Sequence, residues 1–189
     1  MEVQADVRGM DSITRALDAR RAIGEQFREQ VAHGVLTGVV LREGRDSLHI
    51  HGAPGTGKSL VADVVHTLAT DLLRRPGSRV DLDCSVFSAD ELPQMLADAA
   101  ASAAEGTLVL DRLESLSADG LSHVERLQSS QPDVLVVGLS DTSTGLTGAR
   151  LKLKPLHERE CDLWSLVDHY FERTAAELPA HACRGFSRQ

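Results

Sequence analysis

The residues with the most distinctive chemistry in this chain lie together in one short segment. Positions 52–59 read Gly-Ala-Pro-Gly-Thr-Gly-Lys-Ser, which is the spacing of a phosphate-binding loop. A polyphosphate is a dense anion, so a loop that holds it must offer several backbone N–H donors at close range. Gly52, Gly55 and Gly57 allow the backbone angles and the close approach that a Cβ atom would block. The loop is then expected to open a helix, whose N-terminal dipole favours a bound anion.

The side chains of this loop indicate which ligand to expect. Lys58 would meet the β- and γ-phosphates as a positive charge, and Ser59 would offer its hydroxyl to Mg²⁺. A short strand at 48–51 precedes the loop, and apolar residues at helical spacing follow it from Leu60 to Leu73. This context favours a nucleotide site over a glycine-rich turn that matches by chance, so we predict binding of ATP with Mg²⁺. The other predicted binding residues of the segment are Ala53, Pro54, Thr56 and Leu60.

A second segment, Thr-Leu-Val-Leu-Asp at 107–111, reads as an apolar strand that ends in an acid. Beside a phosphate loop such an acid holds Mg²⁺, often through water, and the alternative is that Asp111 only caps the next turn. Ser140 follows a later strand and, like Asp141 and Thr142 beside it, is a candidate for a hydrogen bond to the γ-phosphate. The sequence therefore predicts a metal site made by Ser59 and Asp111.

The residue after Asp111 bears on catalysis. Many ATPases of this kind place a Glu there to polarise the attacking water, but this chain has Arg112, which cannot accept a proton at neutral pH. Glu114 is a second candidate for the carboxylate, although it lies two residues further on and is expected to point elsewhere. The pattern predicts ATP binding without efficient hydrolysis, and leaves open whether the chain works as an enzyme.

Strands and helices alternate along the rest of the chain. The expected strands are 48–51, 79–83, 107–111, 134–139 and 150–153, and the expected helices are 60–74, 88–104, 117–129 and 159–178. This alternation predicts an α/β fold with a parallel sheet covered on both faces. Ahead of it, one helix is expected from a cap at Asp11-Ser12 to a stop at Gly34, and 35–47 is less regular, with room for an extra strand.

Composition narrows the possible partners. The chain has 189 residues, enough for one domain with a sizeable core, and its net charge of −8 argues against non-specific binding to DNA. It has no apolar run of membrane-spanning length, and its N-terminus lacks the pattern of a signal peptide. Cys84, Cys161 and Cys183 are odd in number and show no metal spacing, which suggests reduced thiols and a cytoplasmic location.

From about Leu48 to Ser187 the chain resembles the AAA+ core of the sigma-54-dependent transcription activators, the bacterial enhancer-binding proteins. The strongest match is Leu-Lys-Pro-Leu-His-Glu-Arg-Glu-Cys-Asp-Leu at 153–163, beside the family's Pro-Leu-Arg-Glu-Arg-x-x-Asp-Ile. Shorter matches are Val-Val-His at 64–66, Asp-Cys at 83–84, Glu-Gly-Thr-Leu-Val-Leu-Asp at 105–111 and Gly-Phe-Ser at 185–187.

The resemblance implies a P-loop NTPase with a five-stranded parallel sheet of AAA+ connectivity. It divides the chain into a lead-in at 1–47, an AAA+ core at 48–178 and a tail at 179–189, where a lid that is otherwise missing would begin. The family hydrolyses ATP between subunits of a ring and remodels the promoter complex of the alternative sigma factor. Arg150 matches the second of two family arginines that reach across to a neighbour's phosphate.

The departures from the family pattern limit what can be carried over. The Gly-Ala-Phe-Thr-Gly-Ala loop that contacts the sigma factor is absent between Cys84 and Gly106. Arg112 replaces the catalytic Glu, Asp83 replaces the Asn that restrains it, and 139–141 (Leu-Ser-Asp) replace the sensor Thr-Asn. Three hypotheses remain: a diverged ATPase domain in transcriptional regulation, a nucleotide-dependent interaction module, or an AAA+ loader or chaperone. The expected partners are a second copy, another AAA+ protein or a transcription regulator.

Overall fold

In the computed structural model, which describes residues 2–40 and 47–177, five parallel strands form one sheet in the order β2-β3-β4-β1-β5. The strands are β1 (Leu48–His51), β2 (Arg79–Asp83), β3 (Thr107–Asp111), β4 (Leu135–Ser140) and β5 (Ala149–Lys152). The first three have the predicted bounds, and the last two begin one residue away from them. The predicted parallel α/β sheet is confirmed, and β1 lies between β4 and β5.

The strand sequences explain this order. All six residues of β4 are buried, as an apolar strand at the centre of a parallel sheet should be. Buried and exposed residues alternate along β5, which is an edge strand. The sheet's side chains divide between two hydrophobic clusters, because successive residues of a strand face opposite sides: Val109 and Val137 belong to one cluster, and Leu108 and Val136 to the other.

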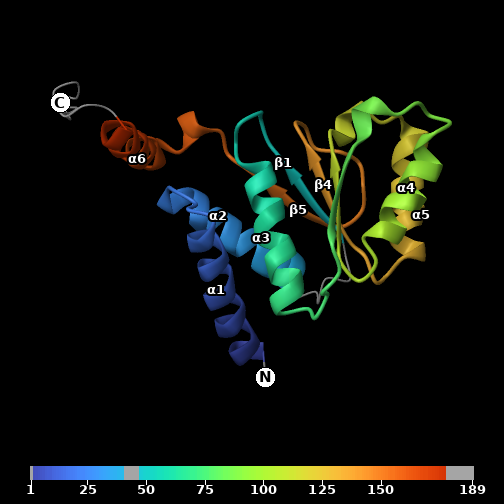
Figure 1. The fold of residues 1–189 in the computed structure, drawn as a ribbon, viewed down its shortest axis with the longest axis horizontal. Coiled ribbons are helices and arrows are strands. Elements are labelled where there is room, and N and C mark those ends of the chain that lie inside the picture. The colour runs from blue at the N-terminus through green and yellow to red at the C-terminus, as the bar shows by residue number, and fades with distance from the viewer. Residues whose placement is uncertain (1, 41–46, 178–189) are drawn as a thin grey trace.

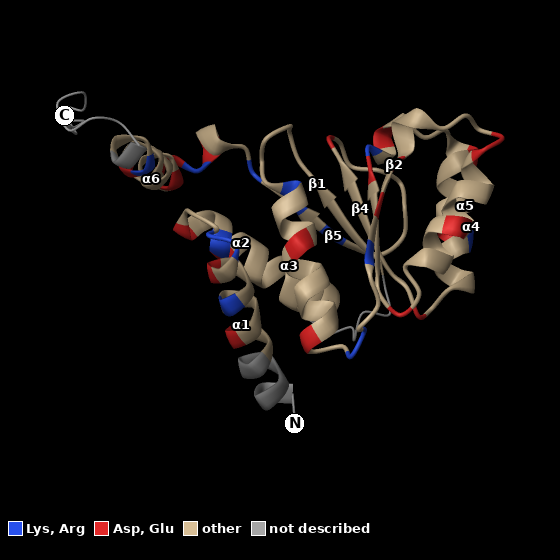
Figure 2. Cartoon of the chain, viewed as in Figure 1, with Lys and Arg blue, Asp and Glu red and all other residues tan. Residues whose placement is uncertain are grey.

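Helices cover both faces of the sheet (Figure 1). The helices are α1 (Glu2–Ala19), α2 (Glu25–Val35), α3 (Lys58–Asp71), α4 (Leu92–Ser102), α5 (Ala118–Ser130) and α6 (Glu160–Glu177). The first cluster lies under α1, α2 and α3, and the second under α4 and α5. None of the helices in the described ranges is long and apolar enough to cross a membrane. Figure 2 shows basic residues interspersed with acidic ones over most elements rather than gathered into one patch.

The N-terminal region differs from the prediction of one helix. The helical path is interrupted between α1 and α2, where Arg21 has φ 51° and Gly24 has φ 97°. Asp11 and Ser12 lie inside α1 and do not cap it, and Gly34 does not end α2. The break exists because Gly24 packs against α6: a Cβ atom on Gly24 would lie 2.4 Å from the carboxyl carbon of Asp162. Sequence periodicity runs through the break and could not show this long-range contact.

The segment after α2 also differs. Residues Leu36–Val40 continue as a π-helical turn, labelled η1, so no strand forms in this part of the predicted lead-in. Val35, Leu36 and Val39 are buried in the cluster under α1 and α3, and their burial supports a helical path. The remainder of the expected extra strand, at 41–46, and the tail at 179–189 lie outside the described residues.

The buried carboxylate of Asp162 joins the N-terminal helices to α6. Its two oxygens accept hydrogen bonds from the backbone N–H groups of Gln26 (3.0 Å) and Phe27 (2.9 Å), at the start of α2. The guanidinium of Arg159 lies 3.4 Å from the same carboxylate and 5.0 Å from the centre of the Phe27 ring. Asp162 therefore caps α2 from a helix 135 residues away, where the N-cap residue Gly24 has no side chain to do so.

His49 is a buried polar residue of β1. Its Nε2 lies 3.0 Å from the carbonyl oxygen of Thr147 and 3.1 Å from the hydroxyl of Ser47, while its Nδ1 has no partner. These contacts give His49 a role in packing and hydrogen bonding, and the described residues contain no cluster of His, Cys, Asp and Glu able to hold a metal ion by themselves. Burial lowers the pKa of His49, and also those of His51 and His66.

Asp162→Ala should destabilise the fold. The change leaves two amide groups of α2 without their acceptor and leaves Arg159 as a buried, unpaired charge, which costs about 3–5 kcal/mol. Urea denaturation followed by circular dichroism measures the change, with Glu172→Ala, an exposed acid of the same helix, as the control. Equal midpoints for Asp162→Ala and Glu172→Ala would contradict the capping role.

Stability should fall as the solution is acidified from pH 7.5 to pH 5.5. The folded chain holds His49 with a lowered pKa, so the unfolded chain, with an ordinary value of about 6.5, binds more protons in this range. The stabilisation is complete above that value and is lost as the pH decreases below it. Denaturant titrations at several pH values test this, and His49→Gln, which keeps a donor for Thr147, should reduce the slope. A stability that is constant or rises on acidification would refute this explanation.

Candidate functional site

The phosphate-binding loop connects the carboxyl end of β1 to the first turn of α3. The N–H of Gly52 donates to the carbonyl of Ser140 at 3.2 Å, which fastens the loop to β4. A Cβ atom on Gly52 would lie 2.6 Å from the carbonyl oxygen of Leu153, so only glycine fits between these strands. Gly57 is the N-cap of α3 in the left-handed conformation, with φ 102°. Thr56 closes the turn with a hydrogen bond from its hydroxyl to the carbonyl of Ala53 at 2.9 Å.

A cleft of about 510 Å³ lies in front of this loop. Its first wall consists of Pro54, Gly55, Gly57, Lys58, Ser59 and Leu60. Its second wall consists of Asp111, Arg112, Glu114, Ser140 and Asp141, which follow the carboxyl ends of β3 and β4. The parallel sheet brings these two walls together, because all carboxyl ends lie at one edge, the place where α/β sheets bind ligands. Most predicted site residues thus meet in one cleft; Gly52, Ala53, Thr56 and Arg150 do not line it.

Lys58 is held at the floor of the cleft. Its ammonium group donates to the carbonyl of Gly52 at 2.7 Å and forms an ion pair with Asp141 at 2.8 Å. The side chain of Lys58 is only 12% exposed, so its position is well defined by these partners. Asp141 was predicted only as an alternative to Ser140 for a contact with the γ-phosphate, and its ion pair with Lys58 was not predicted.

Arg112 points away from Lys58 and towards β2. Its guanidinium donates to the hydroxyl of Ser85 at 3.0 Å and lies 3.4 Å from the carboxylate of Asp83, while its backbone N–H donates to Asp111 at 2.9 Å. Hydrogen bonds from Ser85, together with the charge of Arg112, lower the pKa of Asp83. The two residues that depart from the family's Glu and Asn therefore contact each other as an ion pair. A contact between Arg112 and a bound γ-phosphate would require this pair to open.

The sequence led us to expect that Glu114 points away from the nucleotide site, and this expectation is wrong. Glu114 lines the cleft, and its carboxylate accepts a hydrogen bond from the backbone N–H of Asp141 at 3.1 Å. The reason is the short helical turn η3 (Leu113–Ser115), which directs Glu114 back towards the end of β4. Ser140 also lines the cleft, but its hydroxyl donates to the carbonyl of Thr142 at 2.6 Å.

The residues predicted to hold Mg²⁺ fit that ion. The Ser59 hydroxyl and the Asp111 carboxylate line the same cleft and are the oxygen ligands that Mg²⁺ prefers. Two protein ligands leave most of an octahedral shell to water and phosphate oxygens, which is how Mg²⁺ is held in P-loop proteins.

A second cavity, of about 220 Å³, adjoins the phosphate-binding loop on the side away from β3. It shares Gly55, Gly57 and Leu60 with the cleft. The rest of its lining comes from Thr56 of the loop, from the α1–α2 connection and the start of α2, and from α6 and the turn before it. The residues of these helices and connections are Arg21, Ile23, Phe27, Arg159, Leu166 and Tyr170. Sequence reasoning missed this cavity because three segments far apart in the chain build it, and none carries a motif for it.

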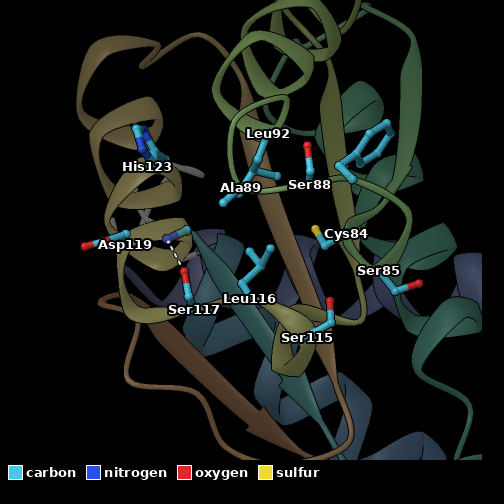
Figure 3. A pocket seen from close by; sticks show the side chains of 12 residues that line it. Cys84, Ser85, Ser88, Ala89, Leu92, Ser115, Leu116, Ser117, Asp119 and His123 are labelled. Carbon is cyan, nitrogen blue, oxygen red and sulfur yellow. Dashed lines mark hydrogen bonds between the residues drawn. The ribbon is translucent and has the colours of Figure 1, made fainter.

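A third cavity, of about 230 Å³, lies between α4 and α5 (Figure 3). Figure 3 shows Cys84, Leu116 and Leu92 pointing towards its centre, with Asp119 and His123 on α5. Burial, followed by the charges of nearby acids, raises the pKa of the Cys84 thiol to about 12. Because a thiolate is the reactive form, Cys84 is not a nucleophile at neutral pH. This cavity is not part of the predicted nucleotide site, although Ser85 joins it to Arg112.

Arg150 lies on the edge strand β5 and is exposed. Its guanidinium donates to the carbonyl of Leu146 at 3.1 Å. Because Arg150 does not line the cleft, its position does not support a role in the nucleotide site of its own chain. A role towards a neighbouring copy stays a prediction.

No family model and no curated protein sequence matches this chain. Its structure is similar to NtrX from Brucella abortus in complex with ATP, with a TM-score of 0.61 and 18% identity over 81% of this chain and 43% of that one. It is also similar to a RuvB mutant from Thermotoga maritima, with a TM-score of 0.55 and 20% identity over 82% of this chain and 52% of that one. A P-loop NTPase domain of a sigma-54 transport activator from E. coli aligns over 55% of this chain and 85% of its own, at 29% identity and a TM-score of 0.42.

The chain thus has the fold of the AAA+ P-loop NTPases, as the sequence predicted. It spans about half or less of the NtrX and RuvB chains.

Proposed function

We propose that this chain is an ATP- and Mg²⁺-binding AAA+ module that hydrolyses ATP slowly or not at all and acts in transcriptional regulation. The observation that carries the proposal is the composition of the 510 Å³ cleft. There Lys58 and Ser59 at the start of α3 face Asp111 at the end of β3, while Arg112 takes the place that a catalytic carboxylate would need. The NtrX structure, which contains ATP, supports nucleotide binding by this fold.

The arrangement of cavities supports an orientation for the nucleotide. Phosphates would lie on the loop, where the first N–H groups of α3 and the charge of Lys58 stabilise anions. The base and ribose would lie in the adjoining 220 Å³ cavity, whose lining includes Phe27, Leu166 and Tyr170. An apolar, aromatic-lined cavity next to an anion site is the usual form of a nucleotide pocket.

Slow hydrolysis follows from the contacts around Arg112. In-line attack on a γ-phosphate needs a group that orients water and accepts its proton. Arg112 cannot accept one, and Glu114 is engaged with the backbone of Asp141. ATP would therefore be retained rather than turned over.

The role in transcriptional regulation rests on the resemblance of residues 153–163 to the sigma-54 activators. Direct contact with the sigma factor is not proposed, because the interval from Cys84 to Gly106 is filled by the eleven-residue helix α4 and short turns. One observation favours a nucleotide-dependent interaction module as the second candidate. Leu163, Trp164 and Tyr170 on α6 are exposed apolar side chains, and Tyr170 also lines the proposed nucleoside cavity.

Lys58→Ala should weaken ATP binding by tenfold or more, because a hydrogen bond to a charged group contributes about 1.5–3 kcal/mol. Isothermal titration calorimetry with Mg²⁺-ATP measures the affinity. The control is Lys154→Ala, which removes an exposed lysine that does not line the cleft. If Lys58→Ala binds ATP as tightly as the wild type, the proposed phosphate site is wrong.

Arg112→Glu combined with Asp83→Asn should raise ATP turnover. Arg112→Glu would restore a carboxylate beside Asp111, and Asp83→Asn would keep that new carboxylate from facing the acid at position 83. A general base contributes roughly 10²–10⁴-fold in rate. A coupled phosphate-release assay measures turnover, and Arg112→Gln, which removes the charge without adding a base, should stay slow. A wild-type turnover near 1 s⁻¹, at the low end of ordinary enzymes, that collapses in Glu114→Gln would show instead that Glu114 is the base.

A further inference from the structure

Each cation that lines the cleft already has a carboxylate partner within the chain. Lys58 is paired with Asp141 at 2.8 Å, and Arg112 lies 3.4 Å from Asp83. Two further carboxylates, those of Asp111 and Glu114, line the same cleft. A polyphosphate entering here therefore meets more negative than positive charge, and it must take Lys58 from Asp141.

The backbone around Asp141 holds its carboxylate in place. Its N–H donates to Glu114, and the hydroxyl of the preceding Ser140 donates to the carbonyl of Thr142 at 2.6 Å. The carboxylate itself is 44% exposed on the cleft side, whereas Lys58 is 12% exposed. The backbone of Asp141 is thus fixed in the wall of the cleft, and its exposed side chain meets Lys58 from there.

The position of Asp141 decides which phosphate it would face. The nucleoside cavity shares Gly55, Gly57 and Leu60 with the cleft, but its lining does not include Asp111, Glu114 or Asp141. These acids lie at the opposite end of the cleft, after β3 and β4. A nucleotide with its base in the nucleoside cavity would therefore direct its terminal phosphate at Asp141, and a longer phosphate chain would approach it more closely.

We propose, on the basis of the nucleotide site assigned above, that Asp141 is a specificity-determining residue that disfavours nucleoside triphosphate relative to diphosphate by competing with the terminal phosphate for Lys58. The β-phosphate can reach the loop N–H groups while Asp141 keeps its ion pair. The γ-phosphate brings a like charge towards the carboxylate and displaces it from the lysine. Mg²⁺ bound by Ser59 and Asp111 offsets this repulsion, so triphosphate binding depends more strongly on Mg²⁺ than diphosphate binding does.

The test is a matrix of affinities measured by isothermal titration calorimetry. ATP and ADP are titrated, each with excess Mg²⁺ and with excess EDTA, into the wild type, Asp141→Asn and Asp133→Asn. Asp133 is the matched control, because it is an exposed acid just before β4, whereas Asp141 lies just after the other end of the same strand. Asp141→Ala serves as a second variant, since asparagine can still accept a hydrogen bond from Lys58.

Removing the charge should tighten ATP binding by about tenfold and ADP binding by about threefold or less, since the lost competitor is a charge-assisted hydrogen bond that acts mainly on the terminal phosphate. The loss of ATP affinity in EDTA should be smaller for Asp141→Asn than for the wild type. Asp133→Asn should match the wild type in all four conditions.

The outcomes separate this inference from the proposed function. If the wild type binds nucleotide and both Asp141 variants bind ATP no more tightly, the inference is wrong and the nucleotide site stands. An equal gain for ATP and ADP also overturns the specificity role, because it would show general attraction of anions. If the wild type does not bind and Asp141→Asn does, the inference is supported; if no variant binds either nucleotide, both proposals fail.

Discussion

The buried carboxylate of Asp162 is the contact on which the arrangement of the N-terminal helices depends. It satisfies two amide groups at the start of α2 and the guanidinium of Arg159, so α2 and α6 are fixed against each other. Phe27 lies under Arg159 and against Gly57 of the phosphate-binding loop. The wall of the proposed nucleoside cavity is therefore set by this buried ion pair, while Gln30 of α2 joins the same helix to the carboxyl end of β5 by donating to the carbonyl of Lys152.

The sheet could be predicted from the sequence because its signals are local. Apolar runs such as 107–111 are bounded by turns, and a helix follows every strand except β4, so periodicity and alternation suffice to give the order of elements. The phosphate-binding loop could also be predicted, since its glycines are required by backbone geometry alone. The break at Gly24 could not be predicted, because its cause, Asp162, is distant in sequence.

In the candidate site, too, the features with local sequence signals could be predicted and those set by contacts with other segments could not. Asp111 and Ser59 follow from position in a motif, whereas the orientation of Glu114 depends on the turn after Arg112, whose φ of 56° no periodicity indicates. Asp141 was predicted only as an alternative contact to the γ-phosphate, because small polar residues are ordinary in turns. Its significance comes only from the 2.8 Å contact with Lys58.

The left-handed backbone at Arg112 has a mechanical consequence. A residue other than glycine adopts this conformation at a cost of roughly 1–2 kcal/mol, so the turn after β3 is a strained joint, held by the contacts of the side chain with Ser85 and Asp83. Directly beyond the joint, Glu114 holds the backbone of Asp141. The end of β2 is thus connected to the phosphate-binding loop by a series of contacts: Asp83 with Arg112, Glu114 with the backbone of Asp141, and Asp141 with Lys58.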